Sequence, residues 1–126
     1  MKMLAAVAFG GAFGAVGRYW VATLAARMLG TGFPYGTLTV NIIGSFIMGV
    51  LVEAAALRLN LSPELRALLA VGVLGSFTTF STFSLDVVLL FERHDNLLGI
   101  LYLLASVILS VGALFCGLRL TRLVLL

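Results

Sequence analysis

The stretch GSFTTFSTFSLD, from Gly75 to Asp86, contains the densest group of side chains that could bind an ion. It carries six hydroxyl groups and three phenylalanines within an otherwise apolar region. Hydroxyl and backbone groups bind ions by hydrogen bonding or coordination, and the edge of a phenylalanine ring is electropositive. Phe77, Phe80 and Phe83 share one face at i, i+3 spacing if the segment is helical, and aromatic packing is then the alternative to contact with an anion.

A second group of hydroxyls lies nearer the C-terminus. Tyr102, Ser106 and Ser110 follow the spacing i, i+4, i+8, which places them on one stripe of a helix. Such a stripe either joins neighbouring helices by hydrogen bonds or forms a polar track through an apolar wall. A track of donors without fixed charge suits a small anion that must bind and still leave.

Further polar side chains fall inside apolar segments. Asn41 lies well within one of them, where its amide would bond across a helix interface or to a permeant species. Spacing alone leaves both interpretations open. Arg18 lies past the middle of another segment, where its side chain either reaches the membrane surface or faces a water-filled cavity. Glu53 and Asp86 come towards the ends of their segments, so we expect them at the membrane interface.

The elements that position these groups follow from composition. Of 126 residues, 62% are hydrophobic and 10% are charged, whereas a soluble domain has about 25% charged residues. A membrane-spanning helix needs about 20 mostly apolar residues. The sequence therefore predicts an all-α integral membrane protein with one transmembrane domain, residues 1–126, and four spans at approximately 3–29, 36–53, 65–91 and 97–118.

The third span is predicted to break near its middle. Two glycines in VGVLG weaken the helix, and the Ser and Thr side chains that follow compete for backbone groups. Broken membrane helices are tolerated where they face protein or an ion, and they leave backbone carbonyls and amides unpaired. We therefore expect backbone groups at this break to be available to an ion.

Neither enzyme chemistry nor nucleic-acid binding is indicated by the sequence. The only cysteine, Cys116, lies inside the fourth span, where we expect it to pack, and the only histidine, His94, lies in a polar connection. We find no nucleophile with a partnered base, no phosphate-binding glycine loop and no metal-ligand spacing. The basic residues that flank the spans divide five to two between the two faces, which favours both termini in the cytoplasm.

The sequence resembles the Fluc family of fluoride channels through GAVGRYW in the first span, GTLTVNIIGSFIMG in the second and GSFTTFSTFS in the third. The match covers nearly the whole chain, and these motifs are specific in combination. The resemblance implies an antiparallel, dual-topology homodimer of four-helix subunits in the inner (plasma) membrane, with two pores at the interface. Because the chain has no internal repeat, two oppositely inserted copies would supply the inverted symmetry that larger transporters obtain by duplication.

The resemblance also implies roles for residues already considered. The expected fluoride pore consists of Asn41, Phe80, Phe83, Tyr102, Ser106 and Ser110. A central, non-transported sodium ion would be held by the backbone carbonyls of Gly75 and Thr78 from both subunits. Arg18 matches the first-span arginine of the family, which implies a vestibule or structural role.

The implied function is passive, selective conduction of fluoride out of the cytoplasm, which lowers fluoride toxicity. Its partners would be fluoride, the lipid bilayer and a second copy of the chain. The alternative is a small dual-topology, proton-coupled multidrug exporter, whose mechanism needs a deep carboxylate. The first span has Arg18 but no acid, which argues against an exporter. A structural or assembly subunit would explain the apolar composition but not the clustered polar groups.

Overall fold

The computed structural model describes all residues from 1 to 126 and contains only helices and their connections. The elements in chain order are α1 (Lys2–Leu29), α2 (Tyr35–Leu57), α3 (Pro63–Arg66), the π-helix η1 (Ala67–Leu74), α4 (Gly75–Phe77), α5 (Ser81–Glu92) and α6 (Asn96–Leu125). They form four rods that are long and apolar enough to cross a membrane, and the third rod combines α3, η1, α4 and α5. The predicted all-α fold with four apolar spans is confirmed.

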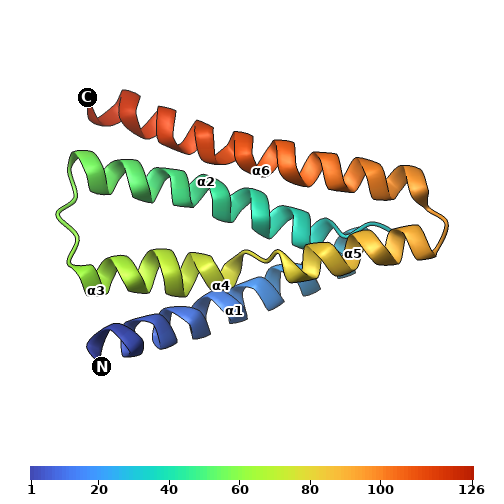
Figure 1. The fold of residues 1–126 in the computed structure, drawn as a ribbon, viewed down its shortest axis with the longest axis horizontal. Coiled ribbons are helices and arrows are strands. Elements are labelled where there is room, and N and C mark those ends of the chain that lie inside the picture. The colour runs from blue at the N-terminus through green and yellow to red at the C-terminus, as the bar shows by residue number, and fades with distance from the viewer.

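The four rods lie lengthwise beside one another, with both termini at the same end (Figure 1). Helix α2 packs along α6, while α1 packs along η1 and α4. At the opposite end, α5 contacts α6. The third rod therefore changes neighbours along its length, and the change takes place where its ribbon narrows to an extended link between α4 and α5 (Figure 1).

Glycines allow α2 and α6 to pack so closely that their backbones are in contact. A Cβ atom on Gly49 would collide with the Leu114 carbonyl oxygen of α6, and one on Gly117 would collide with the Phe46 carbonyl oxygen of α2. Small residues at a crossing bring membrane helices close together, where dispersion contacts replace the hydrophobic effect that lipid does not provide. This crossing fixes the register between α2, which carries Asn41, and α6, which carries the hydroxyl stripe.

The third rod begins at Pro63 and breaks after Phe77. Ser62 caps its first turn by accepting a hydrogen bond from the Leu65 amide at 3.2 Å, and Pro63 occupies the first helical position. Helix α4 ends at Phe77, because Thr78 adopts an extended conformation with φ −81° and ψ 160°. The predicted break is confirmed.

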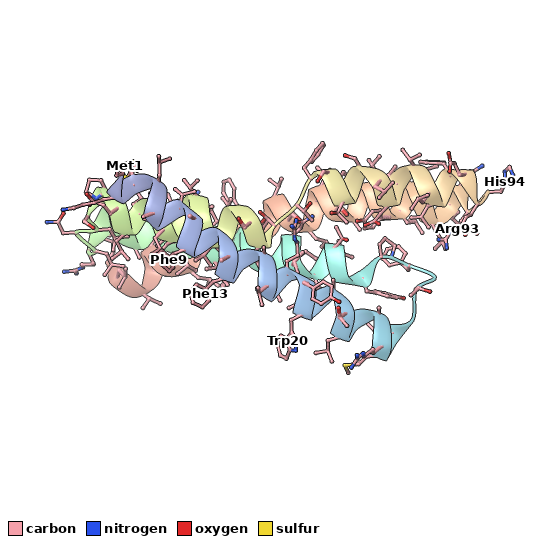
Figure 2. The ribbon with its side chains drawn as sticks, turned by 90° about the horizontal axis from the view of Figure 1, so that it is seen from below. Met1, Phe9, Phe13, Trp20, Arg93 and His94 are labelled. Atoms are coloured by element: carbon pink, nitrogen blue, oxygen red, sulfur yellow. The ribbon has the colours of Figure 1, made fainter.

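Much of the apolar surface is unburied within a single chain. Phe9, Phe13 and Trp20 project from α1 away from the other helices (Figure 2) and are largely exposed. Exposed rings of this size require an apolar surrounding such as lipid or another protein surface. Cys116 is also exposed, so the prediction that it packs among the helices of this chain is wrong.

Candidate ion path and helix break

A groove of about 400 Å³ lies between α2, the helix break and α6. Its lining includes five of the residues predicted for the pore, namely Asn41, Phe80, Phe83, Ser106 and Ser110. The sixth, Tyr102, is fully buried directly behind Phe83, with ring centroids 5.4 Å apart. The fold thus brings together groups from three separate spans.

The three hydroxyls of the α6 stripe differ in their hydrogen bonding, because Tyr102 has a partner in the chain and the two serines have none. The Tyr102 hydroxyl donates to the Asp86 carboxylate at 3.0 Å, which joins α6 to α5. The Ser106 and Ser110 hydroxyls are buried and have no partner within the chain. An unsatisfied buried polar group costs about 1–3 kcal/mol, so we expect these two hydroxyls to bond to something outside the single chain. Helix joining therefore describes Tyr102, while both serines remain available to a bound species.

The phenylalanines are separated by the break. Phe80 is 78% exposed and Phe83 is 9% exposed, and their ring centroids lie 5.5 Å apart with a 52° angle between the planes. Phe77 precedes the break and packs instead against Gly17 of α1 and Gly44 of α2. The prediction that all three rings share one face is wrong for Phe77, because the extended residue Thr78 interrupts the helical periodicity.

Asn41 bonds to the broken backbone through both ends of its amide. Its Oδ1 accepts a hydrogen bond from the Thr79 backbone N–H at 2.8 Å, and its Nδ2 donates to the Thr79 carbonyl at 3.0 Å. The hydrogen bond across a helix interface, one of two alternatives left open by the sequence, is therefore present. The amide nitrogen carries two hydrogens, so one N–H remains for the groove that Asn41 lines.

The carbonyls of Gly75 and Thr78 are the backbone groups expected to hold a cation. Neither accepts a hydrogen bond from the chain. The Thr78 hydroxyl instead donates to the Leu74 carbonyl at 2.9 Å, so this side chain is already occupied. Gly75 is exposed and Thr78 half-buried, which leaves both residues accessible. Two carbonyl oxygens without hydrogen bonds, on residues that are not buried, fit a hard cation such as sodium, since such cations prefer oxygen ligands.

Arg18 lines a second cavity, of about 260 Å³, together with Thr37, Thr79 and Thr82. It is half-buried and forms no ion pair, because both salt bridges in the chain use other residues. This placement agrees with the interpretation that Arg18 faces a cavity. Thr79 lines both cavities, so the Arg18 cavity and the groove meet at the helix break.

Glu53 lies near the end of α2, as expected, but its side chain is buried against α6. Its Oε1 accepts a hydrogen bond from Arg122 Nε at 2.6 Å. The Glu53 side chain is 7% exposed and the Arg122 side chain 52% exposed. This acid is therefore enclosed between two helices and does not line the groove.

Two functional contacts were missed by the sequence reasoning, namely the part played by Thr79 and the bond between Asp86 and Tyr102. A signal for Thr79 existed: a threonine just before a helix commonly accepts from the amide three residues later. Here the Thr82 N–H donates to Thr79 Oγ1 at 3.2 Å. For Asp86 the sequence offered no comparable signal, because its partner lies on another helix.

A family model described as "CrcB-like protein, Camphor Resistance (CrcB)" matches residues 5–118. This chain belongs to the CrcB-like family. A relative from Agrobacterium fabrum is 56% identical over 97% of this chain and 98% of its own length. Another, from Chelativorans sp., is 54% identical over 99% of this chain and 100% of its own length, and one from Rhodospirillum centenum is 55% identical over 97% of each. Each is named a fluoride-specific ion channel.

Family membership and the four apolar helices together give the cellular location. The chain is a multi-pass protein of the bacterial inner membrane. In this CrcB-like protein the exposed rings of α1 are consequently accounted for by an apolar surrounding.

Proposed function

We propose that this chain is a channel, and not an enzyme, that conducts fluoride passively and selectively out of the cytoplasm. The observation that carries the proposal is near full-length identity of 54–56% to relatives named fluoride-specific ion channels. The groove supports it independently, because it gathers hydrogen-bond donors and two phenylalanine rings without a lysine or arginine among its lining residues.

The mechanism rests on partial replacement of the fluoride hydration shell. The hydroxyls of Ser106 and Ser110 would donate hydrogen bonds to the anion, and the remaining Asn41 N–H would add a third donor. The ring edges of Phe80 and Phe83 would contribute weak electropositive contacts. Because none of these groups carries a fixed charge, the anion is bound weakly enough to leave.

Outward conduction follows from the chemistry of hydrogen fluoride. The neutral weak acid crosses lipid from acidic surroundings, ionises at cytoplasmic pH and becomes trapped as the anion. An inside-negative membrane potential drives an anion outward by about 2.3 kcal/mol per 100 mV. A passive channel therefore suffices to lower fluoride toxicity.

We also propose that the working unit is an antiparallel homodimer. One face of the groove is open in the single chain, as the 78% exposure of Phe80 indicates. A second copy would cover this face and offer partners for the two unpaired serine hydroxyls or for the anion they bind. The weak five-to-two charge bias is compatible with insertion in both orientations.

The same dimer would complete a structural sodium site, in which the Gly75 and Thr78 carbonyls of each copy hold one non-transported ion. The support is that these two oxygens accept no hydrogen bond from their own chain. A bound sodium ion would supply a positive charge that stabilises unpaired carbonyl dipoles at the break. The chain's own contribution is to leave these two oxygens without hydrogen bonds, one on Gly75 in α4 and one on the extended residue Thr78.

A proton-coupled exporter is less well supported. It requires a carboxylate that exchanges protons in the substrate path, yet Glu53 is buried with Arg122, and Asp86 accepts from Tyr102. Neither acid lines the groove.

Reconstitution in liposomes distinguishes these functions. We expect fluoride efflux that is electrogenic, requires a potassium ionophore for charge balance, and greatly exceeds chloride efflux. Uptake of an organic cation driven by a pH gradient, without fluoride flux, would establish the exporter. Liposomes in which a folded protein supports neither flux would reject both.

A further inference from the structure

The helix break is maintained by side chains that take backbone donors away from the helix. In a continuous α-helix the Thr79 N–H would bond to the Gly75 carbonyl, and the Thr82 N–H would bond to the Thr78 carbonyl. In this structure the Thr79 N–H donates to Asn41 Oδ1 at 2.8 Å. The Thr82 N–H donates to Thr79 Oγ1 at 3.2 Å. Two side-chain oxygens thus replace the two carbonyls.

Asn41 forms two hydrogen bonds with the Thr79 backbone. Besides accepting from the Thr79 N–H, the amide donates from Nδ2 to the Thr79 carbonyl at 3.0 Å. A backbone N–H requires an acceptor and a carbonyl requires a donor, so this pairing determines which end of the amide faces which group. The remaining Nδ2 hydrogen is thereby fixed in position relative to the groove that Asn41 lines.

The Thr79 side chain acts as an N-terminal cap for the second half of the rod. Its hydroxyl oxygen accepts from the amide three residues later and also donates to Thr82 Oγ1 at 3.2 Å. Thr79 is itself buried, with 9% exposure. The capped helix α5 then carries Phe83, and Phe80 immediately precedes it.

We infer that Asn41 and Thr79 form a brace that holds the break open, leaves the Gly75 and Thr78 carbonyls unpaired, and sets the positions of the two groove phenylalanines. Asn41 is in this respect a positioning residue, in addition to any contact with an anion. The hydrogen bonds of Asn41 and Thr79 by themselves account for the open backbone. Its consequence for sodium and fluoride rests on the proposed function.

The brace is tested with Asn41→Leu, which keeps the branched shape but removes both bonds, and with Thr79→Val, which removes only the hydroxyl. Thr79→Ser retains the hydroxyl and is the matched control. Ser84→Ala is a second control, because the Ser84 hydroxyl donates to the Phe80 carbonyl at 2.9 Å and takes no backbone N–H. The primary measurement is NMR of the detergent-solubilised protein, recording the Thr78 ¹³Cα shift and the exchange rates of the Thr79 and Thr82 amides.

We expect the Thr78 shift to move from extended towards helical values in Asn41→Leu and Thr79→Val, and to stay extended in both controls. Exchange of the Thr82 amide should accelerate about fivefold in Thr79→Val, the equivalent of about 1 kcal/mol for a lost cap. Replacing Thr79 by its α-hydroxy analogue removes the Thr79 N–H and turns the Thr78 carbonyl into a weaker ester acceptor, and it provides a second test should Asn41→Leu not fold. In that variant the Asn41 side-chain N–H should exchange faster.

An extended Thr78 shift in folded Asn41→Leu and Thr79→Val, with unchanged amide exchange, would overturn the brace. The functional consequence is measured separately, as the rise in Tm on adding sodium and as fluoride efflux. Both should decrease in the two brace variants and persist in the controls. If wild-type protein conducts no fluoride or shows no response to sodium, the proposed function fails, whereas the NMR result still decides the brace.

Discussion

Replacing Ser110 by alanine should make the protein more stable and a poorer fluoride conductor. The Ser110 hydroxyl is buried in the groove wall and has no hydrogen-bond partner in its chain. An unsatisfied buried hydroxyl costs about 1–3 kcal/mol, and a hydrogen bond to a charged group contributes about 1.5–3 kcal/mol. Removing the hydroxyl therefore relieves a penalty in the ion-free protein and removes a contact to the anion.

The two effects differ in sign and in size. We expect stabilisation of up to about 1 kcal/mol, because part of the penalty is relieved by water or by a second copy. We expect fluoride efflux to fall by at least about tenfold, since each 1.4 kcal/mol corresponds to one factor of ten. Thermal unfolding in detergent measures the first quantity, and a fluoride electrode measures efflux from liposomes for the second.

Ser84→Ala is the matched control, because its hydroxyl lies outside the groove lining and already bonds along α5. It should leave efflux unchanged. Ser106→Ala should behave like Ser110→Ala, since its hydroxyl is also buried without a partner. If Ser110→Ala lowers stability and conducts at the wild-type rate, the hydroxyl serves helix association, and the polar track through α6 is refuted.

Three further predictions concern other parts of the molecule. Arg122→Ala should destabilise the protein more than Glu53→Ala, because only the first leaves a buried carboxylate unpaired; equal losses in denaturant unfolding would contradict this. Phe80→Ile should fold and dimerise normally but reduce fluoride efflux, since it keeps apolar bulk and loses the electropositive edge; a wild-type rate would indicate a packing role. Gly75→Ala should leave the helical content unchanged, because the φ angle of Gly75 is −63° and an added Cβ would meet only the Ala70 carbonyl oxygen, at 3.5 Å. If the sodium-dependent rise in Tm of this variant also equals that of the wild type, a second copy does not approach Gly75 closely.

The expectation for Gly75 changes with the structure. Its place in a helix break suggests a close backbone approach that only glycine readily permits. Within the chain the residue is right-handed helical, and an added Cβ would make only an ordinary contact with the Ala70 carbonyl oxygen. Any requirement for glycine at this position must therefore arise from another molecule and not from strain in the backbone.

Several features of this protein are determined by the sequence alone, because they depend on neighbours along one helix. The lengths of the apolar runs predict the four rods. Pro63 and Ser62 mark the start of the third rod, and hydroxyl residues that compete for backbone groups mark its break. The i, i+4, i+8 spacing places Ser106 and Ser110 on one stripe, and both lie in the groove wall.

The partners of these groups were decided only by the tertiary structure. Asn41 and Thr79 are separated by 38 positions, and Glu53 and Arg122 by 69. Periodicity within one helix does not predict which residue of a second helix will face it, because this depends on the crossing and register of the two. In this protein glycine contacts set the backbone register of α2 against α6 and of α1 against η1, and Gly44 of α2 lies against the Thr78 side chain. This packing places the Asn41 amide of α2 against the extended link of the third rod.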